Sequence, residues 1–230
     1  MNWSFLSNFA ITLFALLNPL GMLPIFIGYT ARESREVQRL IALFLSLTVL
    51  ALLLIFMLTG SAILNFFGVS LNSFRVAGGI LLLLIGIKIV NGTGATGTTG
   101  LMTKDNQSNL SNLSEAKSIY RQIVIPMAMP LLVGPGVIAN VILYANEAQV
   151  KKEVGLDFGL IIMSAVVSFS VFVILAAGKG LQRLIGDIGI SITQRVMGLF
   201  VAAIGVQFLV TGVSNIIIYN IVPEVLKLLK

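Results

Sequence analysis

The chain has 230 residues, and its composition excludes an ordinary soluble domain. Hydrophobic residues make up 57% of the positions, charged residues only 10%, and the mean hydropathy is +1.01. The absence of cysteine and histidine argues against disulfides, thiolate chemistry and zinc or haem ligation. The net charge of +6 is better explained by membrane topology than by nucleic-acid binding. We therefore expect an integral membrane protein without a cofactor, a bound metal or an enzyme activity.

Six segments are long and apolar enough to cross about 30 Å of hydrocarbon. We expect these spans at residues 5–29, 40–60, 74–90, 123–144, 158–177 and 194–215. The first is read as a retained helix, because it lacks the basic start and the small-residue cleavage pattern of a signal peptide. In the third span only 12 residues separate Arg75 from Lys88, so either both side chains reach opposite membrane interfaces, the favoured interpretation, or the helix starts earlier, near Phe67.

The first and fourth spans each contain a short break with the same spacing. Both breaks have two prolines five positions apart with glycine between them, at Pro19, Gly21 and Pro24 and at Pro130, Gly134 and Pro135, with Gly136 directly after. Proline removes a backbone donor and clashes with the preceding turn, so each helix is expected to open inside the membrane. A single proline kink is usually structural. Paired breaks in two halves of a membrane chain are instead typical of transporters with a site at the midplane.

A polar segment separates two halves of three spans each. Residues 91–118 are rich in Gly and Thr and then in Asn and Ser, a composition that cannot bury enough apolar area to fold alone. We expect one membrane domain over residues 1–230, with a three-helix repeat at 1–90, a flexible linker at 91–118 and a second repeat at 119–220. Because each repeat has an odd number of spans, the second would be inverted relative to the first.

Glycines seven positions apart recur in the third and sixth spans, at Gly79 and Gly86 and at Gly198 and Gly205. Close packing of helices is the favoured interpretation over ligand contact, because lipid offers no hydrophobic force that holds helices together. The fifteen Lys and Arg residues divide ten to five between the two predicted sides. By the positive-inside rule, both termini are predicted to lie outside.

Polar side chains near the breaks are candidate ligand contacts. Asn18 precedes Pro19, Asn140 follows the second break, and Gln207 lies on the sixth span. The partly positive N-terminal ends of broken helices favour a carboxylate, and the opposing carbonyl ends favour an ammonium group, so a zwitterion suits such a site. Each asparagine could equally bond a freed carbonyl of its own break. For Gln207, hydrogen bonding between helices is favoured over ligand contact.

Four runs of residues together resemble the MarC family, which includes the SnatA small neutral amino acid transporters of bacteria and archaea. These runs are residues 17–26, 74–79, 125–136 and 195–207. The resemblance implies a six-helix protein of the bacterial inner membrane, and transport of glycine, alanine, serine or threonine by some members. It carries the family motifs onto the eight break residues Asn18, Pro19, Gly21, Pro24, Pro130, Gly134, Pro135 and Gly136.

The resulting hypothesis is an all-α polytopic secondary transporter made of two inverted three-helix repeats with broken helices 1 and 4. It would export or exchange a small neutral amino acid bound as a zwitterion between these helices at the midplane. No Asp, Glu or His falls inside a predicted span, so coupling through an intramembrane carboxylate is unsupported. A passive pore for small polar solutes and a structural or assembly protein remain alternatives. Whether the chain forms a homo-oligomer is left open.

Overall fold

The computed structural model describes residues 2–92, 113, 116–121, 128, 132–151, 153 and 155–223. Within these ranges all regular secondary structure is helical, as the composition predicts. The named elements are α1 (Trp3–Leu17), α2 (Pro19–Thr30), α3 (Arg35–Phe66), α4 (Leu71–Val90), α6 (Pro135–Lys151), α7 (Leu156–Ala176), α8 (Gly178–Ile216) and the short η2 (Ile217–Ile221).

Five helical segments are long and apolar enough to cross a membrane. They are Trp3–Thr30, Arg35–Phe66, Leu71–Val90, Leu156–Ala176 and Ile188–Tyr219, and they match the first, second, third, fifth and sixth expected spans. The fourth expected span is described mainly through α6, since most of residues 123–131 lie outside the described ranges. The chain is thus a polytopic helical membrane protein.

Several helices extend beyond their predicted spans, because polar residues form their first turns. Ser34 caps α3 by accepting the Val37 N–H at 3.2 Å, and Ser70 caps α4 by accepting the Ser73 N–H at 3.0 Å. Hydropathy places the start of a span at the first long apolar run, but the cap places the start of the helix. The second span was predicted to begin at residue 40, whereas α3 begins at Arg35.

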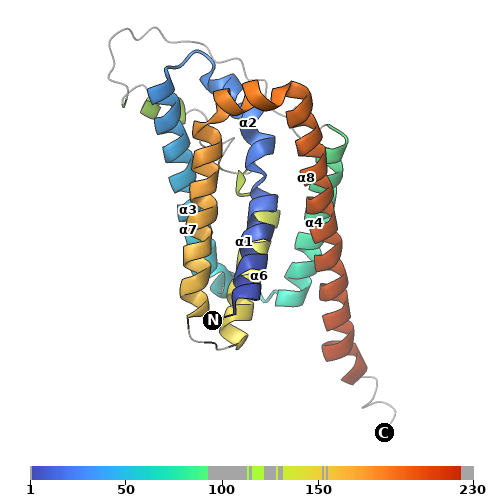
Figure 1. The fold of residues 1–230 in the computed structure, drawn as a ribbon. Helices are drawn as coiled ribbons and strands as arrows, with labels where there is room; N and C mark the ends of the chain where they lie inside the picture. The colour runs from blue at the N-terminus through green and yellow to red at the C-terminus, as the bar shows by residue number, and fades with distance from the viewer. Residues whose placement is uncertain are drawn as a thin grey trace.

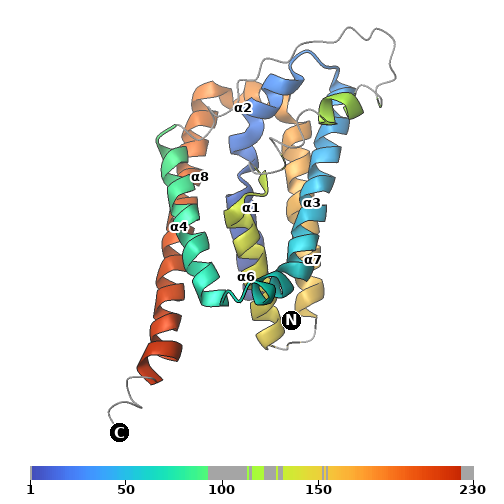
Figure 2. The same cartoon turned by 180° about the vertical axis from the view of Figure 1, so that it is seen from behind.

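The helices form two outer pairs with the broken helices between them. α3 lies beside α7, and α4 lies beside α8, while α1, α2 and α6 occupy the space between these pairs (Figures 1 and 2). α1 and α4 begin, and α6 ends, at the end of the molecule opposite to the α2–α3 connection (Figure 2). A kink at Gly186 divides α8, and the part before it lies across the end of the bundle (Figure 1).

Glycines let α4 and α8 approach until their backbones touch. A Cβ added to Gly79 would lie 2.7 Å from the Gly205 carbonyl oxygen, and one added to Gly86 would lie 2.5 Å from the Ala202 nitrogen. No larger side chain fits at either position without moving backbone. The interpretation of these glycines as packing residues is therefore confirmed.

The far end of the predicted linker is wrong by several residues. Residues 116–121 are helical, Ala116 is completely buried, and the Tyr120 ring lies 5.5 Å from that of Phe44 on α3. Tyr120 also shares a hydrogen bond with Thr48. Apolar residues on one face dock this turn onto α3, which low-complexity composition could not reveal. α4 ends at Val90, directly before the predicted start of the linker at residue 91. The remaining linker residues lie almost entirely outside the described ranges.

Candidate functional site

The first break is a single left-handed residue between α1 and α2. Asn18 has φ 43° and ψ 56°, a conformation that asparagine tolerates better than most residues. Its N–H closes α1 on the Phe14 carbonyl at 3.1 Å, and its side-chain oxygen accepts the Gly21 N–H at 3.2 Å. Pro19 then takes the first position of α2, where its missing N–H costs nothing. Asn18 therefore caps α2 at its own break by accepting a backbone N–H, rather than by bonding a freed carbonyl.

Gly21 is required by this cap and connects it to α8. A Cβ at Gly21 would lie 2.3 Å from the Asn18 side-chain nitrogen, so only glycine leaves room for the asparagine to turn back. The Gly21 carbonyl accepts a hydrogen bond of 2.8 Å from the Gln194 side chain. Pro24 follows one turn later and faces outward, exposed on the surface of the bundle.

The second break directly precedes α6, and it shares the proline position of the first break but, among its described residues, not its left-handed residue. Leu132 and Val133 precede the helix without continuing it, and Pro135 occupies the first helical position, as Pro19 does in α2. The Gly134 carbonyl accepts the Ile138 N–H at 3.1 Å. A Cβ on Gly136 would lie 2.0 Å from a Leu82 methyl group, so α6 begins in close contact with α4. Pro130 lies outside the described residues.

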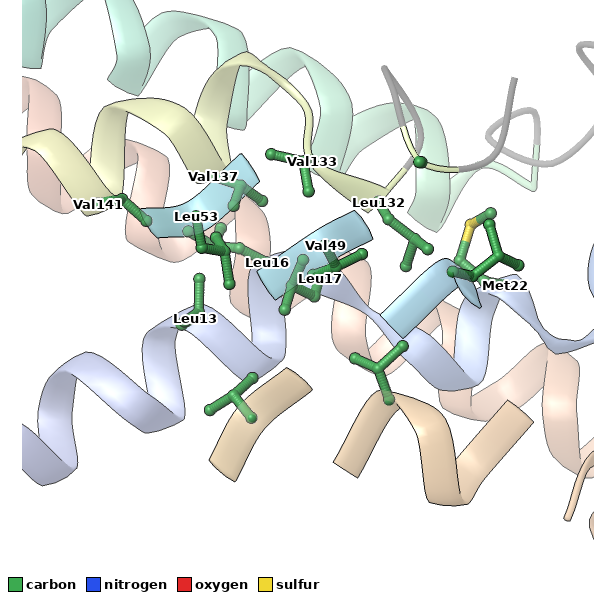
Figure 3. Close-up of a cluster of buried hydrophobic side chains, with 14 of the residues drawn as sticks. Leu13, Leu16, Leu17, Met22, Val49, Leu53, Leu132, Val133, Val137 and Val141 are labelled. Atoms are coloured by element: carbon green, nitrogen blue, oxygen red, sulfur yellow. The ribbon is translucent and has the colours of Figure 1, made fainter. Parts of the chain in front are cut away.

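The two breaks meet in the middle of the bundle. Side chains from both lie together in one apolar cluster, with Leu17 and Met22 from the first break and Leu132 and Val133 from the second (Figure 3). α2 runs from here toward one end of the molecule, and α6 runs toward the other (Figures 1 and 2). The N-terminal ends of both half-helices therefore lie in the interior, where each contributes partial positive charge.

A cavity of about 380 Å³ lies between the breaks and α4. Its volume falls in the usual range for small-molecule sites. Five of the predicted site residues line it: Asn18, Gly21, Gly134, Pro135 and Gly136. The described lining also includes Leu82 and Lys88 of α4 and Gln194 of α8. The cavity reaches the surface at the Lys88 end of α4, since Lys88 and Gly92 are both exposed.

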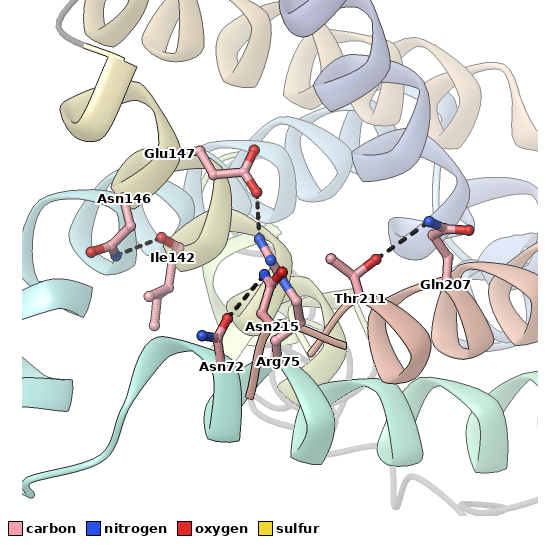
Figure 4. Close-up of polar contacts among 8 residues, drawn as sticks. All are labelled: Asn72, Arg75, Ile142, Asn146, Glu147, Gln207, Thr211 and Asn215. Carbon is pink, nitrogen blue, oxygen red and sulfur yellow. Dashed lines mark hydrogen bonds and ion pairs between the residues drawn. The ribbon is translucent and has the colours of Figure 1, made fainter. Parts of the chain in front are cut away.

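Four other predicted residues do not line the cavity. Pro19 is buried behind the first break, and Pro24 is exposed. Asn140 lies one turn beyond Gly136, is completely buried, and its amide has no hydrogen-bond partner among the described residues. Gln207 is exposed and hydrogen-bonds at 3.4 Å to Thr211 of its own helix, so the favoured bond between helices is not found (Figure 4).

A glutamine of the sixth span other than the predicted Gln207 lies at the cavity. Gln194 meets the cavity, whereas Gln207 lies more than three turns further along α8. Gln194 lies at the predicted start of its span, where a polar side chain is ordinary and gives no signal of a site. α8 begins well before that boundary, with a kink at Gly186, and Gln194 is half-buried on it.

Arg75 is more buried than the sequence predicts. It was expected to reach a membrane interface, but it is only 7% exposed and forms an ion pair with Glu147 of α6 (Figure 4). Arginine hydrogen-bonds readily to carboxylates in such partly buried positions. The partner was missed because Glu147 lies just outside the predicted fourth span, 72 residues away in the sequence.

Comparison with known proteins identifies the family. A family model described as MarC family integral membrane protein matches residues 3–217. The chain belongs to the MarC family. A UPF0056 membrane protein of Buchnera aphidicola subsp. Baizongia pistaciae is 35% identical over 217 residues, covering 93% of this chain and 94% of that protein. No solved structure matches the chain.

Other MarC-family relatives come from distant organisms. A UPF0056 membrane protein of Escherichia coli K12 is 32% identical over 211 residues, covering 91% of this chain and 92% of the relative. One of Methanocaldococcus jannaschii is 36% identical over 206 residues, covering 89% and 93%. The resemblance inferred from the break motifs is thus confirmed across nearly the whole chain.

Proposed function

We propose that this MarC-family protein is a secondary transporter of small neutral amino acids in the bacterial inner membrane. The observation that carries the proposal is the convergence of two half-helix N-terminal ends on one cavity within the membrane-spanning bundle. Interrupted helices at membrane depth are tolerated only where they are buried in protein or line a water-filled cavity. The burial of both breaks and the cavity between them therefore support a binding site inside the bundle.

The cavity offers complementary partners for a zwitterion. Gly136 and Val137 hold the second and third positions of α6, where backbone N–H groups lack helical partners and can donate to a carboxylate. The carbonyl end of α1 and the Asn18 side chain belong to the other break and suit an ammonium group. Leu82 and Ile85 form apolar walls that favour a small side chain.

Contacts between α4 and α8 support two inverted repeats. A Cβ on Gly79 would lie 2.8 Å from the Leu209 nitrogen, and one on Gly198 would lie 3.0 Å from the Val90 nitrogen. Gly198 follows Gly79, and Leu209 follows Val90, by the same 119 positions. The same shift relates a second pair of contacts, Gly205 with the Leu83 nitrogen and Gly86 with the Ala202 nitrogen, each at 2.5 Å. An inverted duplication would produce this exchange.

The expected transport cycle follows from such a repeat. Two halves of similar structure and opposite orientation can exchange conformations, which moves access to a central site from one face of the membrane to the other. The proposal therefore describes a carrier rather than a permanently open pore. A passive pore would use the same cavity but would show neither saturation nor counterflow.

Counterflow in proteoliposomes tests this proposal. Purified protein is loaded with unlabelled glycine, alanine, serine or threonine, and the labelled form is added outside. Ile85→Trp places a large ring in the cavity wall and should abolish transient accumulation. Ile87→Trp is the matched control, because Ile87 is 46% exposed on the outer face of the same helix. Folded wild-type protein that accumulates none of these amino acids would contradict the proposal.

A further inference from the structure

The described lining of the cavity reaches the surface toward one end of the molecule. It opens beside Lys88, toward the end that carries the α2–α3 connection, and its described lining stops at Gly136 and Val137 of α6. Beyond these residues α6 continues toward the opposite end of the bundle (Figure 2). A substrate that enters the cavity beside Lys88 and crosses the membrane must leave by this second end, which the described cavity lining does not reach.

One face of α6 connects the cavity to that end. Gly136, Asn140 and Tyr144 follow each other at intervals of four residues, so they lie on one face with a rise of about 6 Å per step. Gly136 packs against Leu82 of α4, and Tyr144 packs against α1. Asn140 therefore faces the groove between α1 and α4, directly beyond the cavity.

Asn140 is the unusual residue on this face. Its side chain is completely buried, and neither its amide nitrogen nor its amide oxygen has a hydrogen-bond partner among the described residues. A buried amide without partners is costly, so it requires an explanation beyond packing. A polar group one turn beyond the cavity can hydrogen-bond a polar solute that passes, which an apolar residue cannot do.

Past Asn140 the groove is filled by aromatic rings. The Tyr144 ring centroid lies 5.0 Å from that of Phe5 and 5.2 Å from that of Phe9, both on α1. These contacts hold α1 against α6 over the last turns before the surface.

An ion pair secures the same end from the other side. Arg75, in the first turns of α4, pairs with Glu147, which lies one turn beyond Tyr144 (Figure 4). The arginine side chain is 9% exposed and the carboxylate 40% exposed, so the pair lies at the boundary between the interior and the surface. It fastens α4 to α6, just as the aromatic contacts fasten α1 to α6.

We propose that the substrate path continues along the Gly136, Asn140 and Tyr144 face of α6, and that Tyr144 and the Arg75–Glu147 ion pair form the gate that closes it here. This inference rests on the proposed transport function. The described conformation is then the one open toward the Lys88 end. Opening the other end requires Tyr144 to leave Phe5 and Phe9 and requires Arg75 to separate from Glu147.

Chemical labelling from each face of the membrane tests the gate without a transport assay. The natural sequence has no cysteine, so Val137→Cys places a single thiol in the cavity wall. A charged, membrane-impermeant methanethiosulfonate reagent is applied to vesicles of either orientation. The thiol should react from the Lys88 face and remain protected from the Glu147 face.

Gate variants should change the labelling rate of the thiol only from the protected Glu147 face. Glu147→Gln and Tyr144→Ala, each added to Val137→Cys, should raise the reaction rate from the Glu147 face by about tenfold, the effect of weakening closure by roughly 1.4 kcal/mol. The exchanged pair Arg75→Glu with Glu147→Arg should restore protection. Glu153→Gln is the matched control, because Glu153 is an exposed carboxylate at the same end of the molecule.

The reaction rate from the Lys88 face reports whether each variant keeps its cavity, so a folding defect is recognised directly. If the cavity stays intact and both gate variants leave the Glu147 face as protected as before, the gate is elsewhere and this inference is overturned. Protection lost in the gate variants and regained in the exchanged pair would establish it. Failure of counterflow alongside such a labelling result would count against amino acid transport, not against the gate.

Discussion

Gln194 of α8 donates a hydrogen bond of 2.8 Å to the Gly21 carbonyl in the first break. This bond joins two segments 173 residues apart in the sequence, at the point where the helix ladder of α2 is weakened ahead of Pro24. It also places an amide at the wall of the cavity. The residue thus has a structural role that can be separated from ligand binding by measurement.

Replacing Gln194 with Leu should lower stability, because the Gly21 carbonyl would lose its side-chain donor in a partly buried site. We expect a loss of roughly 1 kcal/mol, typical of hydrogen bonds between membrane helices. Thermal unfolding in detergent measures the change. Gln149→Leu is the control, because Gln149 is exposed on α6. Equal effects of the two substitutions would contradict a specific role for the bond.

Replacing Asn140 with Leu should increase stability while reducing transport. The substitution removes a buried amide that has no described partner, which we expect to stabilise the fold by about 1–3 kcal/mol. Counterflow should fall, because the polar step beyond the cavity is lost. Ser164→Ala is the matched control, since the Ser164 hydroxyl is equally buried and unpartnered among the described residues but lies on α7. It should stabilise the protein and leave counterflow intact.

Two substitutions at Asn18 should separate its backbone conformation from its side chain. Asn18→Ala loses the cap on the Gly21 N–H and places an alanine in the left-handed conformation at φ 43°, which alanine adopts poorly. Each of these two effects should lower stability by about 1 kcal/mol. Asn18→Gly loses the same cap but relieves the strain, so it should be the more stable variant in thermal unfolding. The reverse order would show that the break does not need this conformation in the folded protein.

The topology can be tested with single cysteines in the cysteine-free background. Arg35→Cys lies at the start of α3, and Glu153→Cys lies between α6 and α7, and both positions are exposed. An impermeant maleimide should label the first only from the cytoplasmic face and the second only from the opposite face. Labelling of both from one face would contradict the inverted arrangement, and exchanged faces would contradict only the predicted orientation.

Much of the architecture was predictable because its causes are local. Proline and glycine restrict the backbone wherever they occur, so the break before Pro19 and the helix start at Pro135 followed from the sequence. Proline spacing alone gave the wrong register, however. It paired Pro19 with Pro130, whereas the structure gives Pro19 and Pro135 the same position at the start of a half-helix.

The sequence by itself determined the membrane class, the positions of five spans and the residues that open the helices, since hydropathy, helix length and backbone restriction are properties of short segments. Only the tertiary structure decided which polar residues meet. Gln194 at the cavity, Gln207 on the exterior and Arg75 beside Glu147 all depend on how each helix is rotated about its axis. That rotation is set by packing between helices distant in the sequence, such as the glycine contacts of α4 with α8.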